Sequence, residues 1–170
     1  MSCGKWLFQY PNDVLVETGS GGGGGIRYAL KYGFKEIHSI EINKAYYDVC
    51  VNAFRNNPNV FLYLGDSLSL LPQILLEIKG KSTFLLDAHV MDVKSIHGQE
   101  ICPILKELRL ILNHAKQLGV RHSILIDDIK LFSGSVEAFG YIKYTDIEKT
   151  IKDIDPSYTV KGWKRMISAI

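Results

Sequence analysis

Short apolar runs alternate along the chain with segments whose apolar residues recur at helical spacing. An apolar run of about 4–8 residues is typical of a buried strand, and recurrence every three or four residues is typical of an amphipathic helix. The runs predict strands over residues 14–17, 37–41, 60–64, 83–87 and 123–128. The helical patterns cover residues 26–33, 46–54, 68–78, 101–118 and 145–154, and Pro72 is expected in the first turn of the third helix. Residues 158–163 and 165–170 predict a closing hairpin.

The order of these elements indicates the fold class. Strand and helix follow each other at short spacing, and most of the strands are continuous apolar runs. Such strands are buried on both faces, as in a parallel sheet covered by helices. We therefore expect a doubly wound α/β domain with a Rossmann-like, mostly parallel sheet. In such a sheet, ligands bind beyond the carboxyl ends of the strands, where the strand order reverses.

The first expected strand runs directly into the glycine-rich residues 19–25. Glycine adopts positive φ angles and lets another group lie against the backbone. A helix that starts after such a loop points free N–H groups toward a nucleotide or a carboxylate. The loop is therefore a candidate ligand site. A flexible linker is the alternative, because Gly-Ser runs also occur in linkers.

An acidic residue lies at the carboxyl end of each of the expected parallel strands. Because parallel strands end at the same edge of a sheet, we expect these side chains around one cleft. Any single one could instead cap a helix or lie in a solvated turn. The residues are Glu17, Glu41, Asp66, Asp87, Asp127 and Asp128.

The composition limits the classes of protein. A chain of 170 residues that is 46% hydrophobic fits a single domain over residues 1–170, with no separate cap domain. A net charge of +2 without a basic cluster predicts neither a nucleic-acid nor a membrane partner. The three cysteines, Cys3, Cys50 and Cys102, are scattered, which argues against a disulfide framework and a zinc site. With no apolar run typical of a signal peptide or a membrane span, we expect a cytoplasmic protein.

Residues 17–23, Glu-Thr-Gly-Ser-Gly-Gly-Gly, resemble the acidic-x-Gly-x-Gly-x-Gly motif of the class I S-adenosylmethionine (SAM)-dependent methyltransferases. The resemblance extends in order over nearly the whole chain and implies that family's fold, with an antiparallel last strand. It implies that the glycine loop lies under the methionine part of SAM, that Glu41 binds both ribose hydroxyls, and that Asp66 reaches the adenine amino group. The cofactor contacts that it implies are Glu17, Thr18, Gly19, Ser20, Gly21, Gly23, Glu41, Ile42, Asp66, Ser67 and Asp87.

The spacing of the glycines alone leaves a second nucleotide open. Gly19, Gly21 and Gly24 also satisfy the dinucleotide fingerprint of NAD enzymes. Glu17 favours the methyltransferases, because dehydrogenases normally have an apolar residue at that place. The loop does not match a phosphate-binding P-loop, since Ile26 follows the last glycine.

Asp87-Ala-His89 and the pair Asp127-Asp128 resemble the metal-binding positions of the metal-dependent O-methyltransferases, both the catechol type and the sugar-modifying type related to macrocin O-methyltransferase. The resemblance implies a Mg²⁺ ion held by Asp87, Asp127 and Asp128. Independently, three carboxylates from two strand ends are oxygen ligands of the kind that Mg²⁺ prefers. Two alternatives stay open. Asp87 could serve the cofactor alone, and neighbouring residues of a strand alternate in direction, so one of the Asp-Asp pair could face away.

His89 and Asp87 are the candidates for the catalytic step itself. The unperturbed pKa of histidine lies near neutrality, so His89 is the candidate base, although it could merely line the pocket. The catechol enzymes carry a lysine three residues after the first metal ligand, but here Val90 stands at that place. No Asn/Asp-Pro-Pro-Tyr sequence follows the fourth strand, which favours oxygen over nitrogen as the methyl acceptor.

The expected activity is methylation of an oxygen of a small hydroxylated molecule, with assistance from Mg²⁺ if the ion binds. Only about a dozen residues precede the first strand. We therefore expect an acceptor pocket that is shallow, is completed by the second subunit of a homodimer, or is formed by residues 90–100 and 130–144. Two other functions stay open, namely a SAM-binding partner module without activity and an NAD-binding protein.

Overall fold

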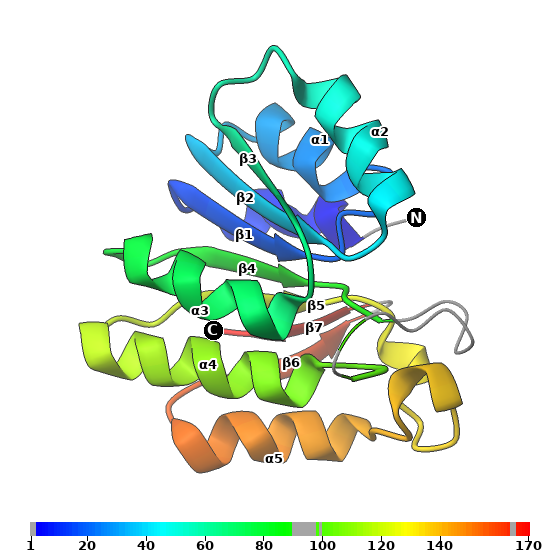
Figure 1. Cartoon of the computed structure of the whole chain (residues 1–170). Helices are drawn as coiled ribbons and strands as arrows, with labels where there is room; N and C mark the ends of the chain where they lie inside the picture. The colour runs from blue at the N-terminus through cyan, green and yellow to red at the C-terminus, as the bar shows by residue number, and fades with distance from the viewer. Residues whose placement is uncertain (1–2, 90–97, 99, 164–165) are drawn as a thin grey trace.

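The computed structural model describes residues 3–89, 98, 100–163 and 166–170. Its strands are β1 (Val14–Thr18), β2 (Glu36–Glu41), β3 (Val60–Leu64), β4 (Thr83–Leu86), β5 (Ser123–Ile126), β6 (Val160–Trp163) and β7 (Met166–Ala169). They form one seven-stranded sheet in the order β3-β2-β1-β4-β5-β7-β6 (Figure 1). Neighbouring strands are parallel except for the pairs β5–β7 and β6–β7, which are antiparallel.

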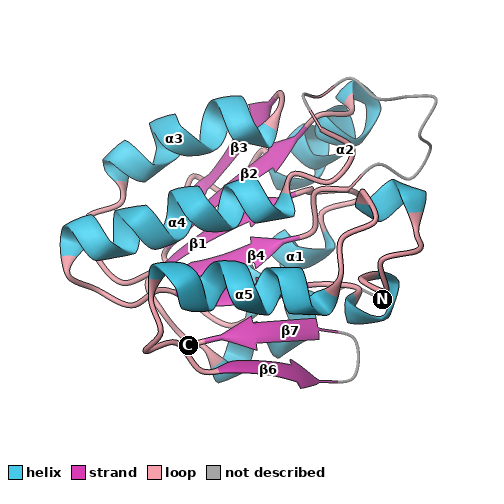
Figure 2. Cartoon of the chain, turned by 90° about the horizontal axis from the view of Figure 1, so that it is seen from below, coloured by secondary structure: helices cyan, strands magenta, loops and turns pink. Residues whose placement is uncertain are grey.

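Helices cover both faces of this sheet. The α-helices are α1 (Gly24–Lys31), α2 (Lys44–Phe54), α3 (Ser67–Glu77), α4 (Ile104–Leu118) and α5 (Tyr144–Ile154), and short 3₁₀ helices are η1 (Cys3–Gln9), η3 (Ile129–Leu131) and η4 (Glu137–Phe139). Figure 2 shows α3, α4 and α5 side by side on one face, whereas α1 and α2 lie on the other, where η1 packs on α1. Among the described residues, no helix combines the length and apolar character that a membrane span requires.

The central strands supply side chains to two separate cores, which explains their continuous apolar runs. Leu15, Leu85 and Leu125 pack with residues of η1, α1 and α2. Their neighbours in the strands, such as Leu86 and Ile126, pack with α3, α4 and α5 on the opposite face. Successive residues of a strand point to opposite faces, so a strand between two helical layers must be apolar at every position.

The predicted fold class is confirmed, because the sheet is mostly parallel and ends in an antiparallel hairpin. All of the predicted strands and helices are present in the predicted order, and the third strand has the predicted bounds of residues 60–64. The N-terminal residues, for which no element was predicted, form η1.

The predicted place of Pro72 in its helix was wrong. The helix α3 begins at Ser67, so Pro72 is its sixth residue and lies beyond the first turn. The start is fixed earlier by Asp66, whose carboxylate accepts a hydrogen bond from the Leu68 backbone N–H at 2.7 Å. Pro72 is exposed, and because proline has no N–H group it cannot donate the usual helical hydrogen bond to the carbonyl of Leu68.

The strand order reverses between β1 and β4, and the carboxyl ends of these two strands lie next to each other. The register pairs Thr18 of β1 with Leu86 of β4, and the backbone N–H of Asp87 donates to the Thr18 carbonyl at 2.9 Å. The glycine loop after β1 therefore adjoins the segment after β4. This is the place where a doubly wound sheet binds its ligand.

Candidate active site

The glycine loop is packed tightly against the segment after β4. Gly19 has a φ angle of +83°, and a Cβ atom added to it would lie 2.5 Å from the carbonyl oxygen of Asp87. Only glycine fits there, because both the backbone angle and the available space exclude a side chain. At Gly21 and Gly22, by contrast, an added Cβ would meet no atom within 4 Å, since these two residues border open space.

That open space is a cavity of about 330 Å³ at the carboxyl edge of the sheet. Seven of the predicted cofactor residues line it: Gly19, Gly21, Glu41, Ile42, Asp66, Ser67 and Asp87. His89, the predicted base, lines it as well. Gly98 and Glu100, from the segment 90–100 that was considered for the acceptor pocket, also line it. Residues with no predicted role complete the wall, including Asn43 and Tyr46 of the α2 start and Ile101 and Pro103 before α4. The N-cap position of Asn43 was the sequence signal that could have identified part of this second group.

Glu41 is held in a fixed orientation at the end of β2. Its Oε2 atom accepts a hydrogen bond from the Gly21 backbone N–H at 2.8 Å, and its Oε1 atom accepts one from the Asn43 backbone N–H at 2.8 Å. One carboxylate thus connects the glycine loop to the start of α2. Each carboxylate oxygen has a further lone pair, so Glu41 can still accept hydrogen bonds from a ligand in the cavity.

Asp66 and Ser67 line the cavity at the start of α3. Asp66 caps the helix with its Oδ1 atom, as described above. Gly98 approaches the same residue so closely that an added Cβ would lie 3.0 Å from Asp66 Oδ2 and 2.9 Å from Ile42 Cδ1. This part of the cavity is therefore narrow and is bounded by one acidic and one apolar side chain.

Four predicted cofactor residues, Glu17, Thr18, Ser20 and Gly23, are not among the residues that line the cavity. Glu17 is 2% exposed and lies beneath the loop, where the Ser39 hydroxyl donates a hydrogen bond to its Oε2 atom at 2.5 Å. The Ser20 hydroxyl in turn lies 2.6 Å from the Ser39 hydroxyl. The structure thus gives Glu17 and Ser20 a supporting position under the loop.

Burial raises the pKa of Glu17 to about 8, and the nearby charge of Glu41 raises it further, whereas the hydrogen bond from Ser39 lowers it. Desolvation disfavours the ionised form of a buried carboxyl group. Glu17 is therefore largely protonated at neutral pH. A neutral acid at this place can donate as well as accept hydrogen bonds.

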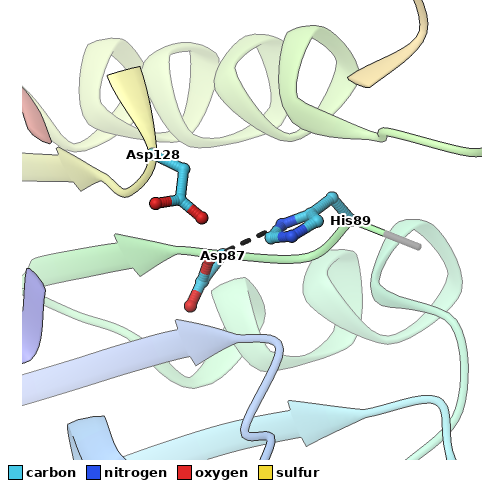
Figure 3. A group of neighbouring side chains, drawn as sticks. All are labelled: Asp87, His89 and Asp128. Carbon is cyan, nitrogen blue, oxygen red and sulfur yellow. Dashed lines mark ion pairs between the residues drawn. The ribbon is translucent and has the colours of Figure 1, made fainter. Parts of the chain in front are cut away.

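Asp87, His89 and Asp128 form the group of described residues that could hold a metal ion, with one ligand atom from each lying within 4.8 Å of the others. Figure 3 shows the three side chains pointing toward one another from the ends of β4 and β5. The Nδ1 atom of His89 lies 3.6 Å from Oδ1 of Asp87. Asp87 and His89 belong both to this group and to the wall of the large cavity.

Asp127, the third predicted metal ligand, is not in this group. It is 4% exposed, and its Oδ1 atom accepts a hydrogen bond from the Asp128 backbone N–H at 2.8 Å. Asp128 has a φ angle of +59°, so the chain turns sharply between the two residues. The structure thus brings together Asp87 and Asp128 and adds His89, for which sequence reasoning considered the role of a base or of a pocket wall but not that of a metal ligand. The spacing Asp-x-His at a strand end was the signal for this further role.

His89 is partly buried, with its ring against Phe139 at a centroid distance of 4.4 Å. Burial lowers the pKa of His89, although the charges of Asp128 and Asp127 act in the opposite direction. The imidazole is therefore neutral at neutral pH and can accept a proton or bind a metal. Most of the segment 90–100, which was considered as part of the acceptor pocket, lies outside the described residues, as does Val90.

No protein-family model matches the sequence, and no curated protein resembles it in sequence. Solved structures do resemble it in fold. An O-methyltransferase from Bacillus cereus in complex with S-adenosylhomocysteine (SAH) aligns with 98% of this chain and 79% of its own, at 13% identity and a TM-score of 0.61. The precorrin-6y C5,15-methyltransferase from Geobacter metallireducens aligns with 98% of this chain and 84% of its own, at 12% identity and a TM-score of 0.63.

Fibrillarin from Aeropyrum pernix, with natively bound S-adenosyl-L-methionine, aligns with 95% of this chain and 67% of its own, at 16% identity and a TM-score of 0.56. At identities of this size the likeness concerns the fold. The chain has the class I SAM-dependent methyltransferase fold, as the motif at residues 17–23 predicted.

Proposed function

We propose that the protein is a SAM-dependent methyltransferase that methylates an oxygen of a small hydroxylated molecule with the help of a divalent metal ion. One observation carries the proposal. Asp87 and His89 belong both to the wall of the cavity beside the glycine loop and to the group of possible metal ligands. A methyl donor in the cavity and an acceptor hydroxyl at the metal group would therefore lie next to each other.

The residues around the cavity fit SAM in their chemistry. The exposed backbone of Gly21 and Gly22 leaves room for the methionine part of the cofactor. The Glu41 carboxylate, fixed by two backbone N–H groups, can accept hydrogen bonds from two ribose hydroxyls. Asp66 and Ser67 can bind the adenine edge. Glu17, Thr18, Ser20 and Gly23 are proposed to hold the loop in shape from below.

Asp87 and Asp128 are the proposed metal ligands, since carboxylate oxygens suit Mg²⁺. When bound, SAM supplies an electrophilic methyl group, and the metal supplies positive charge that favours the ionised form of an acceptor hydroxyl. His89 is the proposed base, because its neutral ring faces the cavity and is held in place by Phe139. Should His89 bind the metal instead, its nitrogen would favour a transition metal over Mg²⁺.

Calorimetric titration of the protein with SAH, with and without Mg²⁺, tests the proposal, and NAD⁺ serves as the control. We expect SAH to bind, NAD⁺ not to bind, and Mg²⁺ to alter the enthalpy or affinity of a diol or sugar added afterwards. Binding of NAD⁺ alone would replace the proposal with a dehydrogenase, and binding of neither ligand would remove the catalytic role of the loop. His89→Gln should then lower turnover while SAH affinity is kept.

A non-catalytic SAM-binding module is the second candidate, and one observation favours it. Phe139 packs against His89 and Phe132 packs against Phe139, and the cavity that these three residues help to line, as far as the described residues define it, is only about 10 Å³. Such a module would bind SAH as the proposed methyltransferase would. It would transfer no methyl group from labelled SAM to any of a panel of catechols, diols and sugars.

A further inference from the structure

Glu107, the fourth residue of α4, is a carboxyl group that is 0% exposed. Fully buried glutamates are rare unless they are paired. Among the described residues, neither of its carboxyl oxygens has a hydrogen-bond partner, and the same holds for the hydroxyl of Thr18, also 0% exposed. Buried polar groups in native proteins almost always have a partner, so these atoms call for an explanation.

The three relevant side chains come from different elements that meet behind the cavity wall. Thr18 is the last residue of β1 and directly precedes Gly19, which lines the cavity. Ser67 is the first residue of α3, lines the cavity, and lies close enough to influence the Glu107 carboxyl. The helices α3 and α4 pack against each other. Glu107 is therefore buried next to the start of α3, which carries Asp66 and Ser67, and is not itself among the residues that line the cavity.

The charge of Glu107 follows from this environment. Burial raises the pKa of Glu107 to about 7, and the charge of Asp66 raises it further, whereas the hydroxyls of Ser67 and Thr18 lower it. Neither hydroxyl meets the geometry of a hydrogen bond to the Glu107 carboxyl group in the structure. A neutral carboxyl group can both donate and accept, so a small rotation or one buried water would join it to both hydroxyls.

Building on the proposed role of the cavity as a SAM site, we propose that Glu107 is a positioning residue for adenine recognition. Its buried carboxyl group links Thr18 at the end of β1 to Ser67 at the start of α3. This link fixes the start of α3, and with it the side chains of Asp66 and Ser67 that face the adenine edge. Loss of the link would let Asp66 shift from the adenine amino group while the rest of the site stays formed.

A comparison of two ligands tests this role. S-inosylhomocysteine differs from SAH at the base, where it has a carbonyl oxygen in place of the amino group that Asp66 can accept from. We expect wild-type protein to favour SAH over this analogue by at least about tenfold, as one lost hydrogen bond to a charged acceptor implies. Glu107→Leu should reduce that ratio to near one, mainly because the affinity for SAH falls. A general loss of structure would lower the affinity for both ligands alike.

Two further variants keep the test decisive. Glu107→Gln has the shape of the neutral acid and should retain the ratio, and the exposed Glu77→Gln at the far end of α3 is the matched control. Thr18→Val removes one hydroxyl without a change of shape and should lower the ratio even if Glu107→Leu does not fold. An unchanged ratio in Thr18→Val, or a loss in Glu107→Gln as large as in Glu107→Leu, would overturn the inference. If wild-type protein binds neither ligand, the proposed function fails instead.

Discussion

Glu17 has a different place in the structure from the one that its motif implies. The motif assigns it to the cofactor, but the side chain is buried under the loop and receives a hydrogen bond from Ser39. An added Cβ at Gly25 would lie 1.8 Å from Glu17 Oε1, so the acid also fixes how closely α1 approaches β1. An acid at this place is thus compatible with a role in shaping the loop.

The burial of Glu17 makes a prediction about stability and pH. Its pKa is raised from 4.5 to about 8, so the folded state keeps a proton that the unfolded chain releases. The contribution of this group to stability is therefore full below about pH 4.5 and is lost as the pH rises toward 8. Relative to Glu17→Gln, wild-type protein should lose up to about 1.4 kcal/mol of unfolding free energy per pH unit between about pH 5 and pH 7.

Urea unfolding of both proteins at pH 5, 6, 7 and 8 measures this difference, and the surface variant Glu77→Gln shows the pH dependence of a mutation at an exposed acid. Groups that face Glu17, such as Glu41, are present in all three proteins and cancel in the comparison. Parallel pH profiles for wild type and Glu17→Gln would mean that Glu17 is ionised in the folded protein.

The two consecutive aspartates after β5 should respond differently to substitution. Asp128 lies in the group with Asp87 and His89, whereas the Asp127 carboxylate is buried and accepts the Asp128 N–H. Asp128→Asn should leave SAH affinity and melting temperature within error but should abolish any effect of Mg²⁺ or Mn²⁺. Asp127→Asn should instead lower the unfolding free energy by about 1–3 kcal/mol, because a buried charge-assisted hydrogen bond is weakened.

Calorimetry with each metal and thermal melting distinguish the two variants. Loss of the metal effect in Asp127→Asn, with Asp128→Asn behaving as wild type, would restore the set of ligands that the sequence resemblance implied.

At the scale of elements, the connection between β1 and α1 leaves no room for a side chain at Gly19. Gly19 and Gly33 have similar φ angles, +83° and +80°, but an added Cβ meets the Asp87 backbone at Gly19 and nothing within 4 Å at Gly33. Gly33→Ala should therefore cost only the backbone strain, about 1–2 kcal/mol. Gly19→Ala should cost more, about 3 kcal/mol or greater, because the contact between the loop and β4 must also open.

Chemical denaturation measures the free energy of unfolding of each variant. The loss in Gly33→Ala reports the backbone strain alone, and the additional loss in Gly19→Ala reports the collision with the Asp87 backbone. We also expect Gly33→Ala to keep its affinity for SAH and Gly19→Ala to lose it. Equal destabilisation of the two would mean that the segment after β4 moves aside easily and that the loop is less constrained than its packing indicates.

The elements themselves follow closely from the sequence because their patterns are local. Strands such as residues 60–64 are defined by apolar runs between turn residues, and the structure keeps those bounds. The start of α3 was placed one residue late and Pro72 was put in the first turn. A helix cap was considered for Asp66 only as the alternative to a ligand role, not as a second role beside it. A residue with two roles is hard to read from spacing alone.

For the molecule as a whole, the sequence predicted the edge at which the site lies but not the direction of each side chain. Parallel strands necessarily bring Glu41, Asp66 and Asp87 to one cavity. Whether Asp127 or Asp128 joins Asp87 depends on a backbone turn with positive φ, which no pattern of residue types reveals. Glu107 was also missed, because in the sequence it is one polar residue in an amphipathic helix, and only the packing of α4 buries it.

The cavity is built from the ends of four strands and the starts of two helices, so its ligand should stabilise the whole domain. A ligand that binds only the folded state adds about 2.7 kcal/mol at a hundredfold excess over its Kd. For a domain of this size that corresponds to a rise in melting temperature of roughly 5–10 °C. SAH should produce this rise in melting temperature, and NAD⁺ should produce none. Glu41→Ala should abolish the effect of SAH, because Glu41 lines the cavity, whereas Glu77→Ala, at an exposed position, should retain it. A rise in Glu41→Ala equal to that of wild type would mean that SAH binds outside this cavity, and the proposed roles of Glu41, Asp66 and Asp87 would then have to be abandoned together.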